Sequence, residues 1–168
     1  MKPETNKNWY AFYTKSRHEK KVKDLLERRG YEVFLPMQKV MRQWSDRKKK
    51  VEVPLFNSYI FVNTYEHQIP EVLQIPGISW SIRHNDKPAM LHPKEYDLIN
   101  RFLATGLTIE VMGADHIDAG DKVKVMDGPL KGAFGQVTKA NPNKFMVSLD
   151  LLGNVMRVEL DPALLKKI

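Results

Sequence analysis

Residues 127–137 read DGPLKGAFGQV and place three glycines and a proline between two stretches of strand-forming residues. Glycine accepts left-handed backbone and close approach by a neighbouring chain, and proline has no backbone N–H to donate. A helix through this segment would lose about 1 kcal/mol at each glycine and about 3 kcal/mol at the proline, relative to alanine. The segment therefore predicts a strand, a tight connection and a second strand.

Two more short strands are expected downstream, at residues 145–149 and 155–160. Turn signals precede both of them: Asn141-Pro142-Asn143 before the first and Gly153-Asn154 before the second. Several short strands separated by such turns are typical of a small all-β barrel. We therefore expect a C-terminal β domain over residues 120–168.

Composition limits the class of protein. The chain has 168 residues, is 42% hydrophobic and contains no cysteine, so it can bury two small cores and cannot form disulfides or thiolate metal sites. No apolar run approaches the roughly 20 residues that span a membrane, and no signal-peptide core is present at the N-terminus. These features predict a cytoplasmic protein that does not bind membranes.

The net charge of +7 is unevenly distributed. Residues 1–106 contain 19 basic and 12 acidic residues, whereas the remainder contains eight of each. A basic surface attracts polyanions, and nucleic acid is the usual one in the cytoplasm. The imbalance favours a nucleic-acid contact in the first part of the chain, although many basic proteins bind no nucleic acid.

The first basic cluster is predicted to lie on a helix over residues 17–29. Ser16 and Glu19 have the spacing of a capping box, and Gly30 stands where glycine commonly ends a helix. Within this helix the basic side chains would form a ridge away from the buried stripe, at Arg17, Lys21 and Arg28. Such a ridge is either a phosphate contact or an ordinary solvated face.

A second basic cluster surrounds a predicted turn at Ser45-Asp46. Its sequence indicates a hairpin or loop that either reaches a phosphate backbone or only solubilises the protein. The cluster consists of six cations: Lys39, Arg42, Arg47, Lys48, Lys49 and Lys50.

The rest of the first part alternates between strand and helix patterns and predicts an α+β domain over residues 1–106, with an antiparallel sheet and flanking helices. Residues 107–119 are expected to link it to the β domain, with a further strand possible at 108–112. Strands are expected at residues 8–15, 31–36, 58–63 and 79–83, and helices near 70–73 and 93–105.

The strand at residues 58–63 has large apolar side chains on both faces. Alternation places Tyr59 and Phe61 on one face and Ile60 and Val62 on the other, and Phe56 precedes the turn. Such a strand either has a layer of protein on each side or leaves a patch that binds a partner.

Three segments in this order, NWYAFYTKSRHEKKVKDLLERRGYEVFLP, VPLFNSYIFV and VKVMDGPLKGAFGQV, resemble the NusG family of transcription elongation factors over nearly the whole chain. The third resembles its KOW motif, with Gly128, Pro129, Gly132 and Gly135 at the turn of an SH3-like barrel. Within the family, PLFNSYIFV is more similar to specialised members such as RfaH and the antiterminators of capsular polysaccharide loci.

This resemblance implies a non-enzymatic factor that binds the clamp helices of RNA polymerase and suppresses pausing and termination at specific operons. The implied polymerase-binding residues are Tyr13, Phe56, Tyr59 and Phe61. The implied contacts with the non-template DNA strand are Lys15, Arg17, His18 and Lys21. An RNA-binding or ribosome-binding protein that contains a KOW domain is the alternative interpretation.

Two departures from the family pattern concern turns. Asn57 and Ser58 replace the Pro-Gly or Pro-Asn that is common in the family before Tyr59, and Leu152 stands before Gly153 where NusG has an aromatic residue. The family implies the ribosome or Rho as partners of the KOW domain. The second departure weakens that inference for this chain. RfaH can refold its C-terminal domain into a helical hairpin, whereas the glycines, prolines and valines here predict a β domain in the free protein.

No catalytic motif is found among the polar residues. The five histidines lack the spacing of metal ligands, and neither a P-loop nor a nucleophile elbow occurs. His116, Asp118 and Asp121 have suitable side chains for a metal, but the stretch is interpreted as an acidic linker. We expect a monomer without cofactor, metal site or enzymatic activity.

Overall fold

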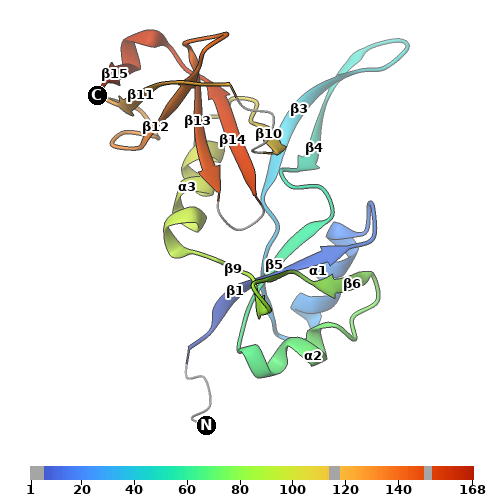
Figure 1. The fold of residues 1–168 in the computed structure, drawn as a ribbon. Helices are drawn as coiled ribbons and strands as arrows, with labels where there is room; N and C mark the ends of the chain where they lie inside the picture. Colours follow the sequence, from blue (N-terminus) through green and yellow to red (C-terminus); the bar gives the residue numbers. More distant parts are fainter. Residues whose placement is uncertain (1–5, 114–117, 150–152) are drawn as a thin grey trace. The chain divides into compact units, whose positions relative to one another are not determined.

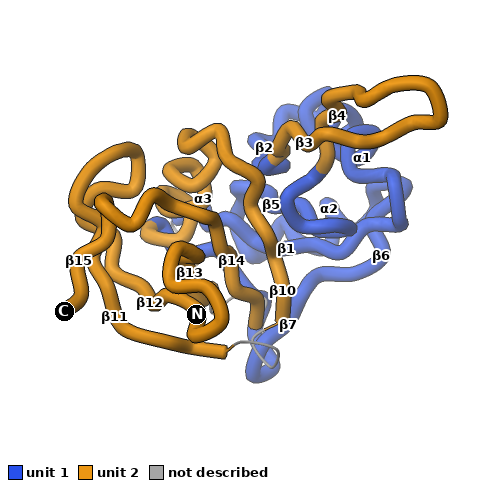
Figure 2. The backbone as a smooth tube through the Cα atoms, turned by 90° about the horizontal axis from the view of Figure 1, so that it is seen from above, with its two compact units in different colours: residues 1–36, 54–93 blue, residues 37–53, 94–168 orange. Residues whose placement is uncertain are grey.

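The computed structural model describes residues 6–113, 118–149 and 153–168. Its contacts divide the chain into two compact units, the first comprising Met1–Pro36 and Pro54–Pro93 and the second Met37–Val53 and Lys94–Ile168 (Figure 2). The predicted domain boundaries, at residues 106 and 119, define two segments that are each expected to fold independently. They remain a prediction.

The first unit is built on an antiparallel sheet with the order β2-β5-β1-β6, in which β9 also pairs with β1 (Figure 1). This arrangement of a sheet with helices is the predicted α+β architecture. The elements are β1 (Asn8–Thr14), α1 (Glu19–Arg28), β2 (Glu32–Phe34), β5 (Tyr59–Thr64), the 3-10 turn η1 (Glu66–Gln68), α2 (Ile69–Val72), β6 (Ile78–Ser81), β7 (Arg83–His84), β8 (Lys87–Pro88) and β9 (Met90–Leu91).

Alternation along β1 and β5 separates two sets of side chains. Phe12 pairs with Ile60 and Tyr10 with Val62, and all four side chains are buried. They form the core of the unit with apolar residues of the two helices, Val22, Leu26, Ile69 and Val72. Tyr13 and Tyr59 pair on the opposite face of the sheet.

Helix α1 begins two residues later than predicted, and the predicted capping box is wrong. Arg17 has a left-handed backbone with φ of 63°, which delays the helix, and no side chain caps its first turn. The end agrees with the prediction. Gly30, with φ of 86°, and Tyr31 donate backbone hydrogen bonds to the carbonyls of Glu27 and Leu26, the pattern of a Schellman motif.

The C-terminal part of the second unit is a six-stranded antiparallel sheet with the order β10-β14-β13-β12-β11-β15. The predicted β domain is therefore confirmed. Its elements are β10 (Glu110–Gly113), β11 (Ala119–Val125), β12 (Phe134–Thr138), β13 (Lys144–Leu149), β14 (Asn154–Glu159), the 3-10 turn η3 (Pro162–Leu164) and β15 (Leu165–Lys167).

The glycine-rich connection lies between β11 and β12 as predicted. Gly128 and Gly132 both have φ of 84°, a conformation that L side chains rarely adopt. Gly135 is needed for another reason: a Cβ there would lie 2.5 Å from the carbonyl oxygen of Met146. The three glycines thus serve the turn and the close approach of β13.

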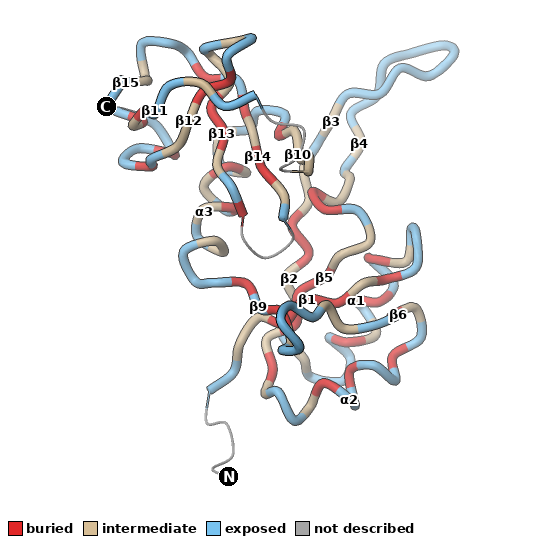
Figure 3. Tube along the Cα trace, in the orientation of Figure 1, coloured by how far each residue is buried: buried red, intermediate tan, exposed pale blue. Residues whose placement is uncertain are grey.

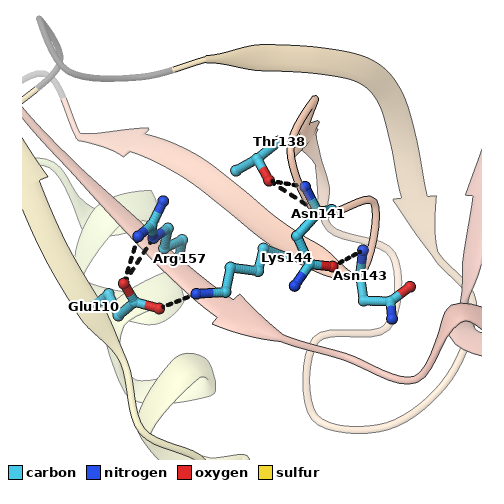
Figure 4. Close-up of polar contacts among 6 residues, drawn as sticks. All are labelled: Glu110, Thr138, Asn141, Asn143, Lys144 and Arg157. Atoms are coloured by element: carbon cyan, nitrogen blue, oxygen red, sulfur yellow. Dashed lines mark hydrogen bonds and ion pairs between the residues drawn. The ribbon is translucent and has the colours of Figure 1, made fainter.

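Strand β10 lies within the predicted linker and pairs with β14. Its Glu110 carboxylate accepts hydrogen bonds from Lys144 Nζ at 2.7 Å and Arg157 Nε at 2.9 Å (Figure 4). Hydrogen bonding from Lys144, and then from Arg157, holds the pKa of Glu110 below its ordinary value, against the effect of partial burial. This part of the linker is therefore an ordered sixth strand.

Helix α3 (Pro93–Ala104) also contacts the barrel within the second unit. The Phe102 and Phe145 rings stack with centroids 6.1 Å apart. The Arg101 guanidinium donates to the backbone carbonyls of Pro129, at 3.0 Å, and Lys131. Part of the glycine-rich turn is thereby held by this helix.

Strands β3 (Met37–Gln43) and β4 (Lys48–Pro54) form the predicted basic hairpin. Trp44 N–H donates to the carbonyl of Arg47 at 2.8 Å and closes the turn, while the Gln38 side chain exchanges two hydrogen bonds with the backbone of Ile109. Residues 41–50 are all exposed (Figure 3).

Among the described residues, no helix combines the length and apolar character needed to cross a membrane.

Candidate docking face and nucleic-acid contact

The face of the first sheet that carries Tyr13 and Tyr59 is rich in aromatic side chains. Tyr13 packs edge-on against Tyr59 with ring centroids 5.5 Å apart, and it stacks on Trp80 at 4.5 Å with an interplanar angle of 7°. Tyr13 and Tyr59 are half-buried, and Trp80 is 54% exposed. These three residues, called the aromatic cluster below, present apolar surface to solvent.

The other two predicted docking residues lie deeper. Phe56 and Phe61 are buried, and their rings pack edge-on with centroids 6.3 Å apart. Phe61 also contacts Phe34 at 6.0 Å. Replacing either by alanine would cost about 3–5 kcal/mol of stability, so neither substitution tests docking alone.

Trp80 was not predicted as a site residue, because only the pairing of β6 with β1 shows that it lies beside Tyr13. Tyr13 pairs with Trp80, but the next residue, Thr14, pairs with Ile78, so a bulge occurs at this point. The irregularity places Ile78 among the buried residues while Trp80 remains exposed on the aromatic face. Strand periodicity alone assigns the two residues to one face and could not separate them.

The predicted nucleic-acid residues gather at the N-terminal end of α1. Lys15 and Arg17 precede the helix, His18 is its N-cap residue and Lys21 lies in its first turn. Lys15, Arg17 and Lys21 are exposed, whereas His18 is half-buried and its Nδ1 donates to the carbonyl of Ser16 at 2.8 Å. The positive end of the helix dipole adds to the attraction that these cations exert on an anion.

A buried carboxylate links the basic end of α1 to the turn before the aromatic strand. Glu19, 7% exposed, accepts a hydrogen bond from the backbone N–H of Ser58 at 3.0 Å. The carbonyl of Ser58 in turn accepts from Thr14 N–H at 2.7 Å. The predicted polymerase-binding and DNA-binding residues are therefore held in one small region of the first unit.

The turn that departs from the family pattern has a left-handed residue. Ser58 has φ of 67°, at the position where the resembled pattern has glycine or asparagine. A serine in this conformation costs about 1–2 kcal/mol relative to right-handed backbone. The Glu19 hydrogen bond helps to offset this cost.

The C-terminal site residues all lie in the β11–β12 connection or at the start of β12. Gly128, Pro129 and Gly132 form the exposed turn, and Gly135 is half-buried in β12. Leu152, the second departure from the family pattern, and the candidate metal ligand His116 lie outside the described residues. Within the described residues there is no group of three metal-ligating side chains.

Comparison with known proteins matches both parts of the chain. Residues 7–100 match the family described as "Transcription termination factor nusG", and residues 119–150 match the KOW motif. An α+β domain with an aromatic sheet face, followed by a KOW barrel, is the class that the fold and sequence define. The chain belongs to the NusG family.

Curated relatives and a solved structure cover most of the chain. The NusG protein of Lactococcus lactis is 26% identical over 170 residues, 93% of this chain and 90% of that protein. The protein from Streptococcus pyogenes serotype M1 is 28% identical over 171 residues, 92% and 94% of the respective chains. Both are named "Transcription termination/antitermination protein NusG". A structure titled "Domain interaction in Thermotoga maritima NusG" aligns with a TM-score of 0.59 at 23% identity, covering 96% of this chain and 97% of that one, and supports the fold.

Proposed function

We propose that this protein is a transcription elongation and antitermination factor that binds the clamp helices of RNA polymerase and the non-template DNA strand. It makes and breaks no bond. It acts as a ligand that binds the processive state of the polymerase more tightly than the paused state and so shifts the population. Its relatives' names and the family match support a role in transcription.

The aromatic cluster carries the docking proposal. Tyr13, Tyr59 and Trp80 combine large apolar surface with few rotatable bonds, the properties of residues that dominate protein interfaces. Phe56 and Phe61 are buried, so neither would contact the partner with most of its surface. The clamp helices are the occupant that the family resemblance assigns to this face.

The basic end of α1 carries the DNA proposal. The exposed cations Lys15, Arg17 and Lys21 lie beside a turn that leads directly into the aromatic strand. A factor docked through the aromatic cluster would bring these cations to the transcription bubble at the same time. His18 is half-buried, and its Nδ1 already donates to the carbonyl of Ser16, so it contributes less than the three exposed cations.

Specialisation for particular operons is part of the proposal, and its support is the resemblance of the PLFNSYIFV segment to RfaH. The proposed partner of the KOW barrel is the ribosome or Rho. The rival function, an RNA-binding or ribosome-binding KOW protein, predicts ribosomal proteins rather than polymerase subunits in a pull-down.

Substitutions of two members of the aromatic cluster, the half-buried Tyr59 and the exposed Trp80, test the docking. Tyr59→Ala and Trp80→Ala should each weaken binding to purified core RNA polymerase by about 1 kcal/mol or more, roughly fivefold, because each removes an aromatic anchor. The dissociation constant is measured for each variant by its binding to polymerase immobilised on a sensor surface. Circular dichroism verifies the fold of each variant.

Met90→Ala is the matched control. Met90 is 49% exposed and pairs with Tyr10, which places it away from the aromatic cluster. It should bind polymerase like the wild type. Wild-type affinity in both Tyr59→Ala and Trp80→Ala would show that the cluster is only the outer layer of the core and would refute the docking assignment.

A further inference from the structure

The β3–β4 hairpin carries the second basic cluster, which the proposed docking and DNA contacts do not use. Its outer residues, 41–50, are all exposed. The hairpin contains six cations but only two acidic residues, Asp46 and Glu52. Within the part of the chain that the structure describes, none of the six forms an ion pair with a carboxylate. The hairpin therefore holds uncompensated positive charge.

An aromatic residue lies in the middle of this charge. Trp44, at the turn, is 42% exposed, and two cations lie over its ring: Lys49 Nζ at 4.9 Å and the Arg47 guanidinium carbon at 5.7 Å from the ring centroid. Neighbouring Met41 is 60% exposed and adds apolar surface. A purely solubilising tip has no need of a large exposed ring.

We infer that the tip of this hairpin, Trp44 with Arg47, Lys48, Lys49 and Lys50, is a binding surface for single-stranded nucleic acid. An unpaired base would stack on Trp44, and the flanking cations would contact the phosphates on either side. Proteins that bind single strands combine these two elements, a positively charged track and an aromatic platform.

The present contacts of Trp44 are compatible with this exchange. Stacking of a nucleobase on an aromatic ring is stronger than a cation–π contact at an exposed site. A base that takes the ring face would displace Lys49 or Arg47, and the displaced cation would then be free to neutralise a phosphate. In the free protein, Trp44 and the two cations therefore contact one another. In the complex, the ring would contact a base and the cations would contact phosphates.

A single strand is favoured over a duplex because a base inside a duplex has no free face for Trp44. The hairpin is also a two-stranded ribbon closed by a tight turn, so its tip can follow a flexible strand without a preformed groove. This inference does not depend on polymerase docking, because the free protein would bind the strand.

The test uses the full chain and fluorescein-labelled 12-nucleotide oligothymidylate, with oligouridylate and a 12-base-pair duplex as comparison ligands, measured by fluorescence anisotropy. Trp44→Ala should weaken binding to the single strands at least about fivefold, while Trp44→Phe, which keeps an aromatic face, should retain most of the affinity. Equal loss for DNA and RNA identifies base stacking as the shared determinant, and the wild-type affinities for the two oligonucleotides show which strand is preferred.

The combined variant Lys48→Gln, Lys49→Gln, Lys50→Gln tests the phosphate contacts. Removing three contacts should reduce the slope of log affinity against log salt by about 2, so between 50 and 200 mM salt the wild type should lose about 20-fold more affinity than the variant. A charge-matched control on the barrel, Lys122→Gln, Lys131→Gln, Lys166→Gln, should keep the wild-type slope.

Other outcomes would overturn the inference. They are wild-type affinity in Trp44→Ala, a salt slope in the hairpin variant equal to that of the barrel control, or tighter binding to the duplex than to the single strands. Loss of polymerase binding with unchanged oligonucleotide affinity would assign the hairpin to a protein partner and would also refute it. A parallel variant with Lys15, Arg17 and Lys21 changed to Gln separates failure here from failure of the proposed DNA contact at α1.

Discussion

Gly135→Ala should destabilise the barrel more than any other glycine substitution in the KOW turn. The Cβ of an alanine would lie 2.5 Å from the carbonyl oxygen of Met146 and 2.7 Å from Cε2 of Phe145. Real contacts of this kind are well above 3 Å, so β13 would have to move. Because β13 pairs with β12 on one side and β14 on the other, its backbone cannot shift alone.

The magnitude follows from the kind of strain. Overpacking of a well-packed site costs about 1–3 kcal/mol, and a clash with paired backbone belongs at the upper end, about 3 kcal/mol. Gly132→Ala is the control, because a Cβ there meets nothing within 4 Å and only its φ of 84° is unfavourable. The left-handed backbone costs about 1–2 kcal/mol, and the less flexible unfolded chain returns part of it, which leaves about 1 kcal/mol.

Hydrogen exchange of the full chain, followed by mass spectrometry of peptides from β13 and β14, measures both effects. Amide protection should fall by about 100-fold in Gly135→Ala and by about fivefold in Gly132→Ala if exchange occurs through opening of the barrel. The steric account is refuted if Gly132→Ala loses as much protection as Gly135→Ala, or if Gly135→Ala loses less than about fivefold.

Two further predictions concern the turn at Ser58 and the Glu110 ion pairs. Ser58→Gly should raise the free energy of unfolding by about 0.5–1 kcal/mol in urea titrations, because glycine relieves the left-handed strain; a decrease would contradict it. Glu110→Gln should lower stability near neutral pH by about 1 kcal/mol, a value reduced for the partial exposure of the carboxylate. Since the folded pKa of Glu110 is lowered, its contribution is complete above the unfolded-state pKa of about 4.3 and is lost as the pH falls through the folded pKa. Urea titrations should therefore show the difference from wild type shrinking below about pH 4, and a difference that is constant with pH would refute the ionic account.

Patterns of period two and the turn residues were sufficient to predict the architecture. The glycines at 128, 132 and 135 predicted the strand connection, and Gly30 predicted the end of α1. The start of α1 was not predictable, because Glu19 bonds to Ser58, which is 39 residues away in sequence, instead of capping its own helix. Local spacing cannot reveal such a long-range partner.

The candidate site was only partly predictable for a similar reason. Alternation correctly separates Tyr59 from Ile60, but it says nothing about how deeply Phe56 and Phe61 lie. Phe61 packs against Phe34, which comes from another strand, and Phe56 packs against Phe61. Trp80 was missed because the sequence does not reveal that its strand pairs with β1 beside Tyr13, and the bulge that buries Ile78 is equally hidden. Depth and bulges depend on neighbouring strands, so a single sequence does not determine them.

The pairing of β10 with β14 has a consequence for solubility. Without β10, the outer edge of β14 would expose unpaired N–H and C=O groups next to buried side chains such as Val155 and Met156, and such edges promote association with other chains. With β10 in place, the terminal strands of the sheet are short: β10 has four residues and β15 has three, two of which are exposed lysines. The segment between the two predicted domains thus protects the barrel from aggregation by edge-to-edge pairing.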